Sequence, residues 1–169
     1  MVVIHIAGST GSGKTWIGLL MKRIYPDKKL HVEDLDHLFR EAIVQSKEKD
    51  PEKQFRQIET RVRERVAGLR RAHTNLLLTG YSDVVIEGKV RYVELAADVK
   101  YFIDIPTKFL IQQYRYRASQ YVAHTRHEAR ALSDPDLRKL VANDRKVYSS
   151  FPMVAQAQIV KQIILRLGK

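Results

Sequence analysis

The chain of 169 residues lacks cysteine altogether, has no long apolar run and carries few acidic side chains for its number of basic ones. The absence of cysteine excludes disulfides and thiolate metal sites, as suits a reducing cytoplasm. No run reaches the ~18 apolar residues of a membrane-spanning helix, so we expect no membrane partner. The chain passes from Met1 almost directly into a glycine-rich motif, so we expect no signal peptide and a cytoplasmic location.

The shortage of acidic residues is greatest at the end of the chain. Thirty Lys and Arg against 19 Asp and Glu give a net charge of +11, of which residues 1–107 hold +3 and residues 108–169 hold +8. A basic field attracts polyanions such as nucleotides or nucleic acid. A solvated basic surface that keeps the protein soluble accounts for the same surplus, so the charge alone leaves both interpretations open.

The glycine-rich segment has the pattern G-x-x-x-x-G-K-[ST]. Its glycines let backbone N–H groups turn around an anion, its lysine reaches the β- and γ-phosphates, and its last hydroxyl ligates Mg²⁺. Residues 2–7 are typical of a buried strand, and residues 15–24 of a helix whose N-terminus faces the same phosphates. The segment therefore predicts a nucleoside triphosphate site with Mg²⁺, made by Gly8, Ser9, Thr10, Gly11, Ser12, Gly13, Lys14 and Thr15.

Strand and helix patterns alternate along the rest of the chain. The strand patterns lie at 30–32, 75–80, 99–106 and, more weakly, 151–154; the helix patterns lie at 37–46, 52–72, from Thr107 as N-cap, 135–149 and 156–167. Residues 83–95 predict a hairpin around Gly88, with a helix over 91–97 as the alternative. The alternation predicts one α/β domain over 1–169, with a parallel sheet covered by helices on both faces.

Two acidic residues follow the second predicted strand. In a parallel sheet the phosphate loop, Asp34, Asp36 and Gly80 all come at the same edge, because each follows a strand. One carboxylate can hold Mg²⁺, which we assign to Asp34 beside Thr15, and the other can take a proton from an acceptor hydroxyl, which we assign to Asp36. The structural alternative is that Asp36 caps the following helix.

Arginines supply the third element of the predicted chemistry. A basic segment at 115–135 resembles a lid, in which Arg115 and Arg117 would contact ATP and Arg117 would stabilise the transition state. For each arginine alone, a solvated surface position explains the residue equally well. The residues we assign to the acceptor are Asp36, Arg40, Arg63, Gly80, Arg126 and Arg130.

With these motifs, nearly the whole chain resembles the small P-loop kinases of metabolites, nucleosides and nucleotides, which include the adenylate, shikimate and gluconate kinases. The resemblance rests on residues 8–15, the acidic pair, the strand ending in Gly80, and the strand 101–106 with its arginine-rich continuation. It implies a five-stranded parallel sheet of order 2-3-1-4-5, a mobile lid, ATP as donor and Mg²⁺ as cofactor.

The segment after the third strand departs from that family. Nucleoside monophosphate kinases carry D-G-F-P-R there, whereas this chain has Thr79-Gly80-Tyr81-Ser82-Asp83, and the glycine run of the shikimate and gluconate kinases is reduced to Gly80. These departures leave the acceptor open. Our first hypothesis is an ATP-dependent small-molecule kinase that acts on a nucleoside or nucleotide. A kinase of polynucleotide 5′-hydroxyls and a regulatory NTP-binding module without transfer chemistry are the alternatives, in a monomer or homodimer.

Overall fold

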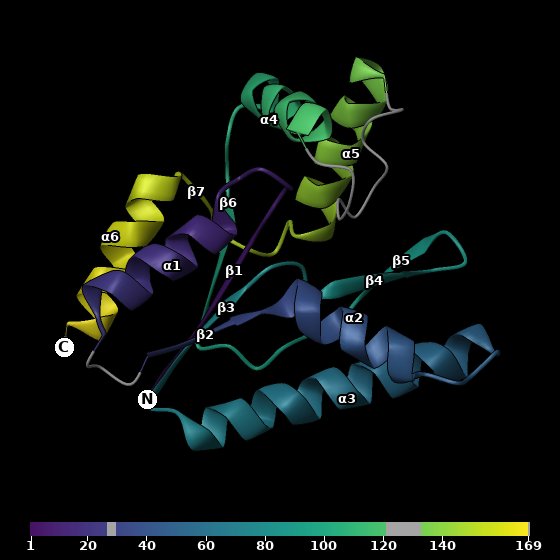
Figure 1. Cartoon of the computed structure of the whole chain (residues 1–169), viewed down its shortest axis with the longest axis horizontal. Coiled ribbons are helices and arrows are strands. Elements are labelled where there is room, and N and C mark those ends of the chain that lie inside the picture. The colour runs from purple at the N-terminus through teal and green to yellow at the C-terminus, as the bar shows by residue number, and fades with distance from the viewer. Residues whose placement is uncertain (27–29, 121–132, 169) are drawn as a thin grey trace.

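The computed structural model describes residues 1–26, 30–120 and 133–168, with the backbone alone at 117–120. A central sheet lies between two helical layers, and a pair of helices stands apart from it (Figure 1). The sheet is parallel throughout and has the order β2-β3-β1-β6-β7. Its strands are β1 (Val2–Gly8), β2 (Leu30–Asp34), β3 (Asn75–Thr79), β6 (Val99–Ile103) and β7 (Met153–Val154).

The predicted strand order is confirmed. A separate antiparallel hairpin, β4 (Asp83–Ile86) and β5 (Lys89–Tyr92), does not join the sheet, so β6 and β7 are the fourth and fifth sheet strands along the chain. The turn at Glu87 and Gly88 has positive φ at both residues, which suits a two-residue hairpin turn. The alternative helix over 91–97 is wrong, because residues 91–92 belong to β5 and residues 93–97 form no helix.

Alternate residues of the strands face the two helical layers, as expected for a parallel sheet. Val3, Leu76 and Leu78 pack with α2 (Leu35–Gln45) and α3 (Pro51–Ala72). Ile4, Ile6 and Leu77 pack against the opposite layer, made of α1 (Lys14–Ile24) and α6 (Gln156–Leu167). In α3 the side chains that repeat at three- and four-residue steps are the buried ones: Ile58, Val62, Val66 and Leu69.

The helices α4 (Thr107–Gln120) and α5 (Asp134–Val147) form a small core of their own, at the top of Figure 1. Leu110, Ile111 and Tyr114 of α4 are buried there with Leu137 and Val141 of α5. At the start of α4, the Thr107 hydroxyl accepts a hydrogen bond from Arg145 Nη1 over 3.1 Å. This contact ties α5 to the end of β6 and so places both helices beside the carboxyl edge of the sheet.

Candidate functional site

The loop between β1 and α1 curves in a way that its glycines make possible. Gly11 and Gly13 have φ of 87° and 88°, which side chains other than glycine rarely adopt. A Cβ on Gly11 would lie 2.9 Å from Gln113 Cβ of α4, and one on Gly13 would run into the Gln156 side chain of α6. At these two positions the loop has room for glycine alone, and the bare glycine backbone suits a phosphate cradle.

Lys14 lies over this loop. Its Nζ donates hydrogen bonds to the carbonyl oxygens of Gly8 (2.6 Å) and Ser9 (3.3 Å) and lies 4.8 Å from the centre of the Tyr81 ring. The next residue, Thr15, is exposed at the start of α1, so its hydroxyl is accessible. The glycine cradle, the adjacent ammonium group and the accessible hydroxyl fit a magnesium–triphosphate.

The acidic pair lies at the junction of β2 and α2, where Asp34 is the helix cap. Asp34 Oδ1 accepts from the amide of Asp36 over 3.0 Å, so the alternative in which Asp36 caps this helix is wrong. Asp36 instead reaches across to the next strand, where its Oδ1 accepts from the amide of Tyr81 over 3.1 Å. The two carboxylates thus have different tasks in the fold.

Gly80 makes this close approach possible. A Cβ at Gly80 would lie 3.0 Å from Asp36 Oδ1 and 3.3 Å from Asp34 Oδ1, and its φ is 123°. The structure therefore brings Gly80 and both acids together, as the sequence predicted. Because any side chain would push the acids away, the need for glycine here is spatial as well as conformational.

The acids influence each other electrostatically. Burial raises the pKa of Asp34, the charge of Asp36 raises it further, and Lys14 acts in the opposite direction. A cation near Asp34 and the accessible Thr15 hydroxyl would relieve this repulsion. Among the described residues, no three His, Asp or Glu side chains converge as a metal cluster.

Two buried tyrosine–aspartate pairs join this edge of the sheet to α5. The Tyr81 hydroxyl donates to Asp144 Oδ2 (2.8 Å) and accepts from the amide of Thr10 (3.1 Å) in the phosphate loop. The Tyr148 hydroxyl donates to Asp83 Oδ1 (2.6 Å). Burial raises the pKa of Tyr148, so this hydroxyl keeps its proton. Tyr81 therefore touches the phosphate loop, Lys14 and Asp36 at once.

A buried histidine supports the same turn from below. His5 of β1 is fully buried, and its Nε2–H donates to the carbonyl oxygen of Gly80 over 3.1 Å. Its ring also meets that of Phe151 edge-on. Burial lowers the pKa of His5 to about 4, so the imidazole is neutral at pH 7. The sequence analysis missed His5 and Tyr81 as site residues, since a histidine in an apolar strand and a tyrosine after a glycine give no local signal of these contacts.

A cavity of about 330 Å³ opens beside the acids. Asp36 and Tyr81 line it and also belong to the phosphate-loop region, so the loop and the cavity share a wall. The other lining residues come from α2 and the β4–β5 hairpin: Phe39, Arg40, Ile43, Val44, Asp83, Val84 and Val85. Two larger cavities along α3 contain no residue of the loop or the acidic pair. Of these three cavities, the one beside Asp36 is therefore the one that adjoins the phosphate loop.

The predicted arginines fall in different places. Arg40 lines the cavity, whereas Arg63 pairs with Glu59 (2.9 Å) and lines a different cavity next to Arg70. The structure therefore does not place Arg63, which we assigned to the acceptor, at the cavity beside Asp36. The Arg117 side chain and all of Arg126 and Arg130 lie outside what the structure describes.

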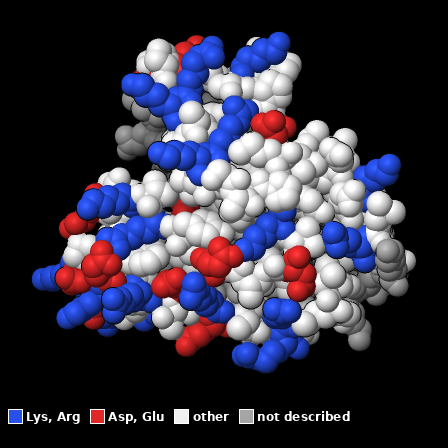
Figure 2. Space-filling model, turned by 180° about the vertical axis from the view of Figure 1, so that it is seen from behind, with Lys and Arg blue, Asp and Glu red and all other residues white. Residues whose placement is uncertain are grey.

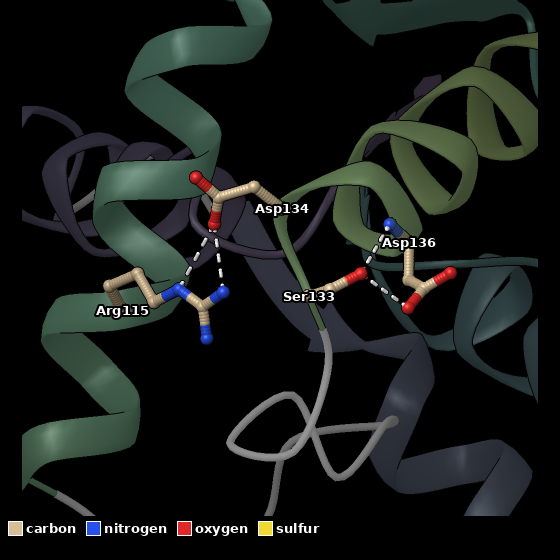
Figure 3. A network of polar contacts seen from close by, with 4 residues as sticks. All are labelled: Arg115, Ser133, Asp134 and Asp136. Carbon is tan, nitrogen blue, oxygen red and sulfur yellow. Dashed lines mark hydrogen bonds and ion pairs between the residues drawn. The ribbon is translucent and has the colours of Figure 1, made fainter.

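Arg115 is held by an acid from the neighbouring helix. Its guanidinium donates twice to Asp134 Oδ1, over 2.8 and 3.3 Å, and Ser133 caps α5 one residue earlier (Figure 3). Both members of the pair are well exposed, so the pair is weak and exchanges readily. Around it, Lys and Arg predominate at the top of Figure 2, where α4 and α5 lie, while both signs mix below.

Solved structures share this architecture. Shikimate kinase from Bacteroides thetaiotaomicron superposes with a TM-score of 0.62 at 15% identity, covering 99% of both chains. A tunicamycin resistance protein from Deinococcus radiodurans gives 0.61 at 12% identity, covering 99% of this chain and 95% of the other. Deoxyadenosine kinase from M. mycoides, solved with dCMP and a flexible dCDP, gives 0.54 at 15% identity and 98% coverage of both.

The chain has the fold of the small P-loop kinases. The match extends over essentially the full length, so it includes the phosphate loop, the acidic pair and the α4–α5 pair. No protein-family model matches the chain, and no curated protein matches it. Among the described helices, none has the length and apolar character needed to cross a bilayer.

Proposed function

We propose that this protein transfers the γ-phosphoryl group of ATP to a hydroxyl of a small acceptor, a nucleoside or nucleotide. The observation that carries the proposal is the wall shared by the phosphate loop and the cavity, where Asp36 and Tyr81 lie. ATP bound at the phosphate loop and an acceptor bound in the cavity would then both lie next to the Asp36 carboxylate. The shared fold with a deoxyadenosine kinase and two shikimate kinases supports a transferase of this kind.

Each residue has a defined task in this reaction. The loop amides and Lys14 hold the triphosphate, while Thr15 and Asp34 hold Mg²⁺, which would neutralise charge on the phosphate oxygens. Asp36 takes the proton of the acceptor hydroxyl. The hydroxyl oxygen bonds to the γ-phosphorus as the bond from that phosphorus to the β–γ bridging oxygen breaks, giving ADP and a phosphomonoester. Arg115 and Arg117 approach the transferring group from α4, once Arg115 has left Asp134.

The test uses isosteric variants of the two acids. Asp36→Asn keeps an acceptor oxygen for the Tyr81 amide, so the fold survives, and we expect kcat to fall by about a hundredfold or more because the proton acceptor is lost. Asp34→Asn keeps the helix cap and should instead raise the Mg²⁺ concentration needed for half-maximal rate. Asp50→Asn, at the cap of α3, is the matched control. Unchanged transfer to the acceptor in Asp36→Asn would show that Asp36 is not the proton acceptor, whereas ATP hydrolysis at an unchanged rate with no acceptor phosphorylated would favour an NTP-binding module.

The basic surface favours a second candidate, a kinase of polynucleotide 5′-hydroxyls. Residues 108–169 carry +8, and Lys and Arg predominate where α4 and α5 lie (Figure 2). A polymer acceptor releases many counterions on binding, so its kcat/KM should fall steeply with salt, whereas a mononucleotide gives a shallow slope. The slope of kcat/KM against salt concentration, measured with a 5′-hydroxyl oligonucleotide and with a nucleoside, separates the two candidate functions.

A further inference from the structure

The cavity beside Asp36 has two chemically different ends. Its inner end, next to the phosphate loop, carries Asp36, Tyr81 and Asp83. Its outer end consists of apolar side chains from α2 and from β4, of which Phe39 and Val84 are buried and Ile43, Val44 and Val85 are exposed. A molecule that fills it therefore presents a polar group inward and an apolar body outward.

Three of the apolar side chains at the outer end are exposed to solvent. Val44 is 78% exposed, Val85 46% and Ile43 40%, and all three line the same cavity. Single exposed apolar residues are common, but a cluster around a concavity marks a place where a ligand covers them. Because apolar burial is favourable in proportion to area, an apolar acceptor body gains affinity here.

The charges that line the cavity argue against an anionic acceptor. Two carboxylates, Asp36 and Asp83, face one guanidinium, Arg40. Asp83 is nearly buried, and the Tyr148 hydroxyl donates to it. A second phosphate or a carboxylate on the acceptor would come close to these two acids, and like charges repel.

We propose that the acceptor is an uncharged hydroxyl compound with an apolar body, a nucleoside rather than a nucleotide or a sugar acid. This rests on the proposed function and narrows it. The reaction is the γ-phosphoryl transfer of the proposed function: an uncharged alcohol binds, its proton goes to Asp36, and a phosphomonoester leaves. The same carboxylates that repel anionic acceptors repel this charged product, so the cavity also favours its release.

The test compares acceptors in matched pairs. Adenosine and AMP, deoxycytidine and dCMP, and uridine and UMP, with shikimate as a sugar acid, are each incubated with Mg²⁺ and ATP labelled at the γ-phosphate. We expect at least one nucleoside to be phosphorylated, with kcat/KM at least about a hundredfold above that of its monophosphate. Faster transfer to a monophosphate or to shikimate would overturn the inference while leaving the kinase function intact. No transfer to any acceptor, charged or uncharged, would reject the kinase function itself.

Two variants test separately the apolar side chains and the carboxylates that line the cavity. Val44→Glu should raise KM for the nucleoside about tenfold without changing KM for ATP. Leu165→Glu is the matched control, because Leu165 is also exposed (51%) in the last turn of a helix, on α6 outside the cavity. Asp83→Asn keeps the oxygen that Tyr148 needs and should raise the AMP-to-adenosine ratio of kcat/KM about tenfold. An unchanged KM in Val44→Glu, or an unchanged ratio in Asp83→Asn, contradicts the corresponding half of the inference.

Discussion

The two halves of the site are built in different ways. On the donor side, eight consecutive residues form a cradle of backbone amides, and one side chain, Lys14, completes it. On the acceptor side, the contacts come from side chains of α2, the β3–β4 segment and α5, brought together only by the fold. In the proposed reaction, the donor side would thus be generic and locally encoded, and the acceptor side would carry the specificity.

The largest effect should come from removing the ammonium group of Lys14 from the proposed donor side. Lys14→Ala removes the cation from the developing charge, and we expect kcat to fall by about a thousandfold, measured by ADP formation. Lys22→Ala, an exposed lysine on the same helix, should leave the rate unchanged. A folded Lys14→Ala protein with wild-type kcat would show that the loop does not act as a phosphate site.

The next largest effect concerns His5, which supports the turn between the two sides. Its folded pKa of about 4 lies below the ordinary 6.5, so the unfolded chain binds a proton that the native protein does not. The stability from neutral His5 is fully present above pH 6.5 and is lost as the pH falls toward 4, by about 3 kcal/mol in total. Chemical denaturation at several pH values measures this loss. A His5→Leu variant should show a flatter acid limb, and an equally steep one would assign the loss to other groups.

A smaller effect sharpens the comparison between the two tyrosines. Tyr81→Phe and Tyr148→Phe each remove a hydroxyl bonded to a buried aspartate, so each should lower the free energy of unfolding by about 1–3 kcal/mol. Of the two hydroxyls, only that of Tyr81 also accepts a hydrogen bond from the Thr10 amide of the phosphate loop. Tyr81→Phe should therefore tighten binding of a non-hydrolysable ATP analogue by about threefold, since that amide becomes free for phosphate. Equal affinities in the two variants would mean that the Thr10 contact does not compete with the nucleotide.

Most of the structure that the sequence predicted depends on residues that are close together in the chain. The phosphate loop, the strand before it and the helix after it depend on neighbouring residues, and α3 was readable from its apolar repeat. The position of Gly80 against the acids followed from the shared edge of parallel strands.

What the sequence could not supply depends on contacts between distant segments. Asp34 caps α2, while Asp36 accepts a hydrogen bond from the Tyr81 amide, which lies 45 residues further along the chain. The sequence gives no local signal of that contact. The tyrosine–aspartate pairs join residues more than sixty positions apart, and no periodic pattern encodes them. Arg63, which the sequence analysis assigned to the acceptor, instead lines a different cavity together with Arg70.

The account depends on the loop and the cavity acting as one site, and a label-transfer experiment tests this most directly. The wild-type protein is incubated with Mg²⁺, ATP labelled at the γ-phosphate and adenosine or deoxycytidine, and the products are separated. We predict label in a nucleoside monophosphate, at a rate that falls steeply in Lys14→Ala and in Asp36→Asn. Label found only in ATP or inorganic phosphate, with every acceptor unmodified, would contradict it.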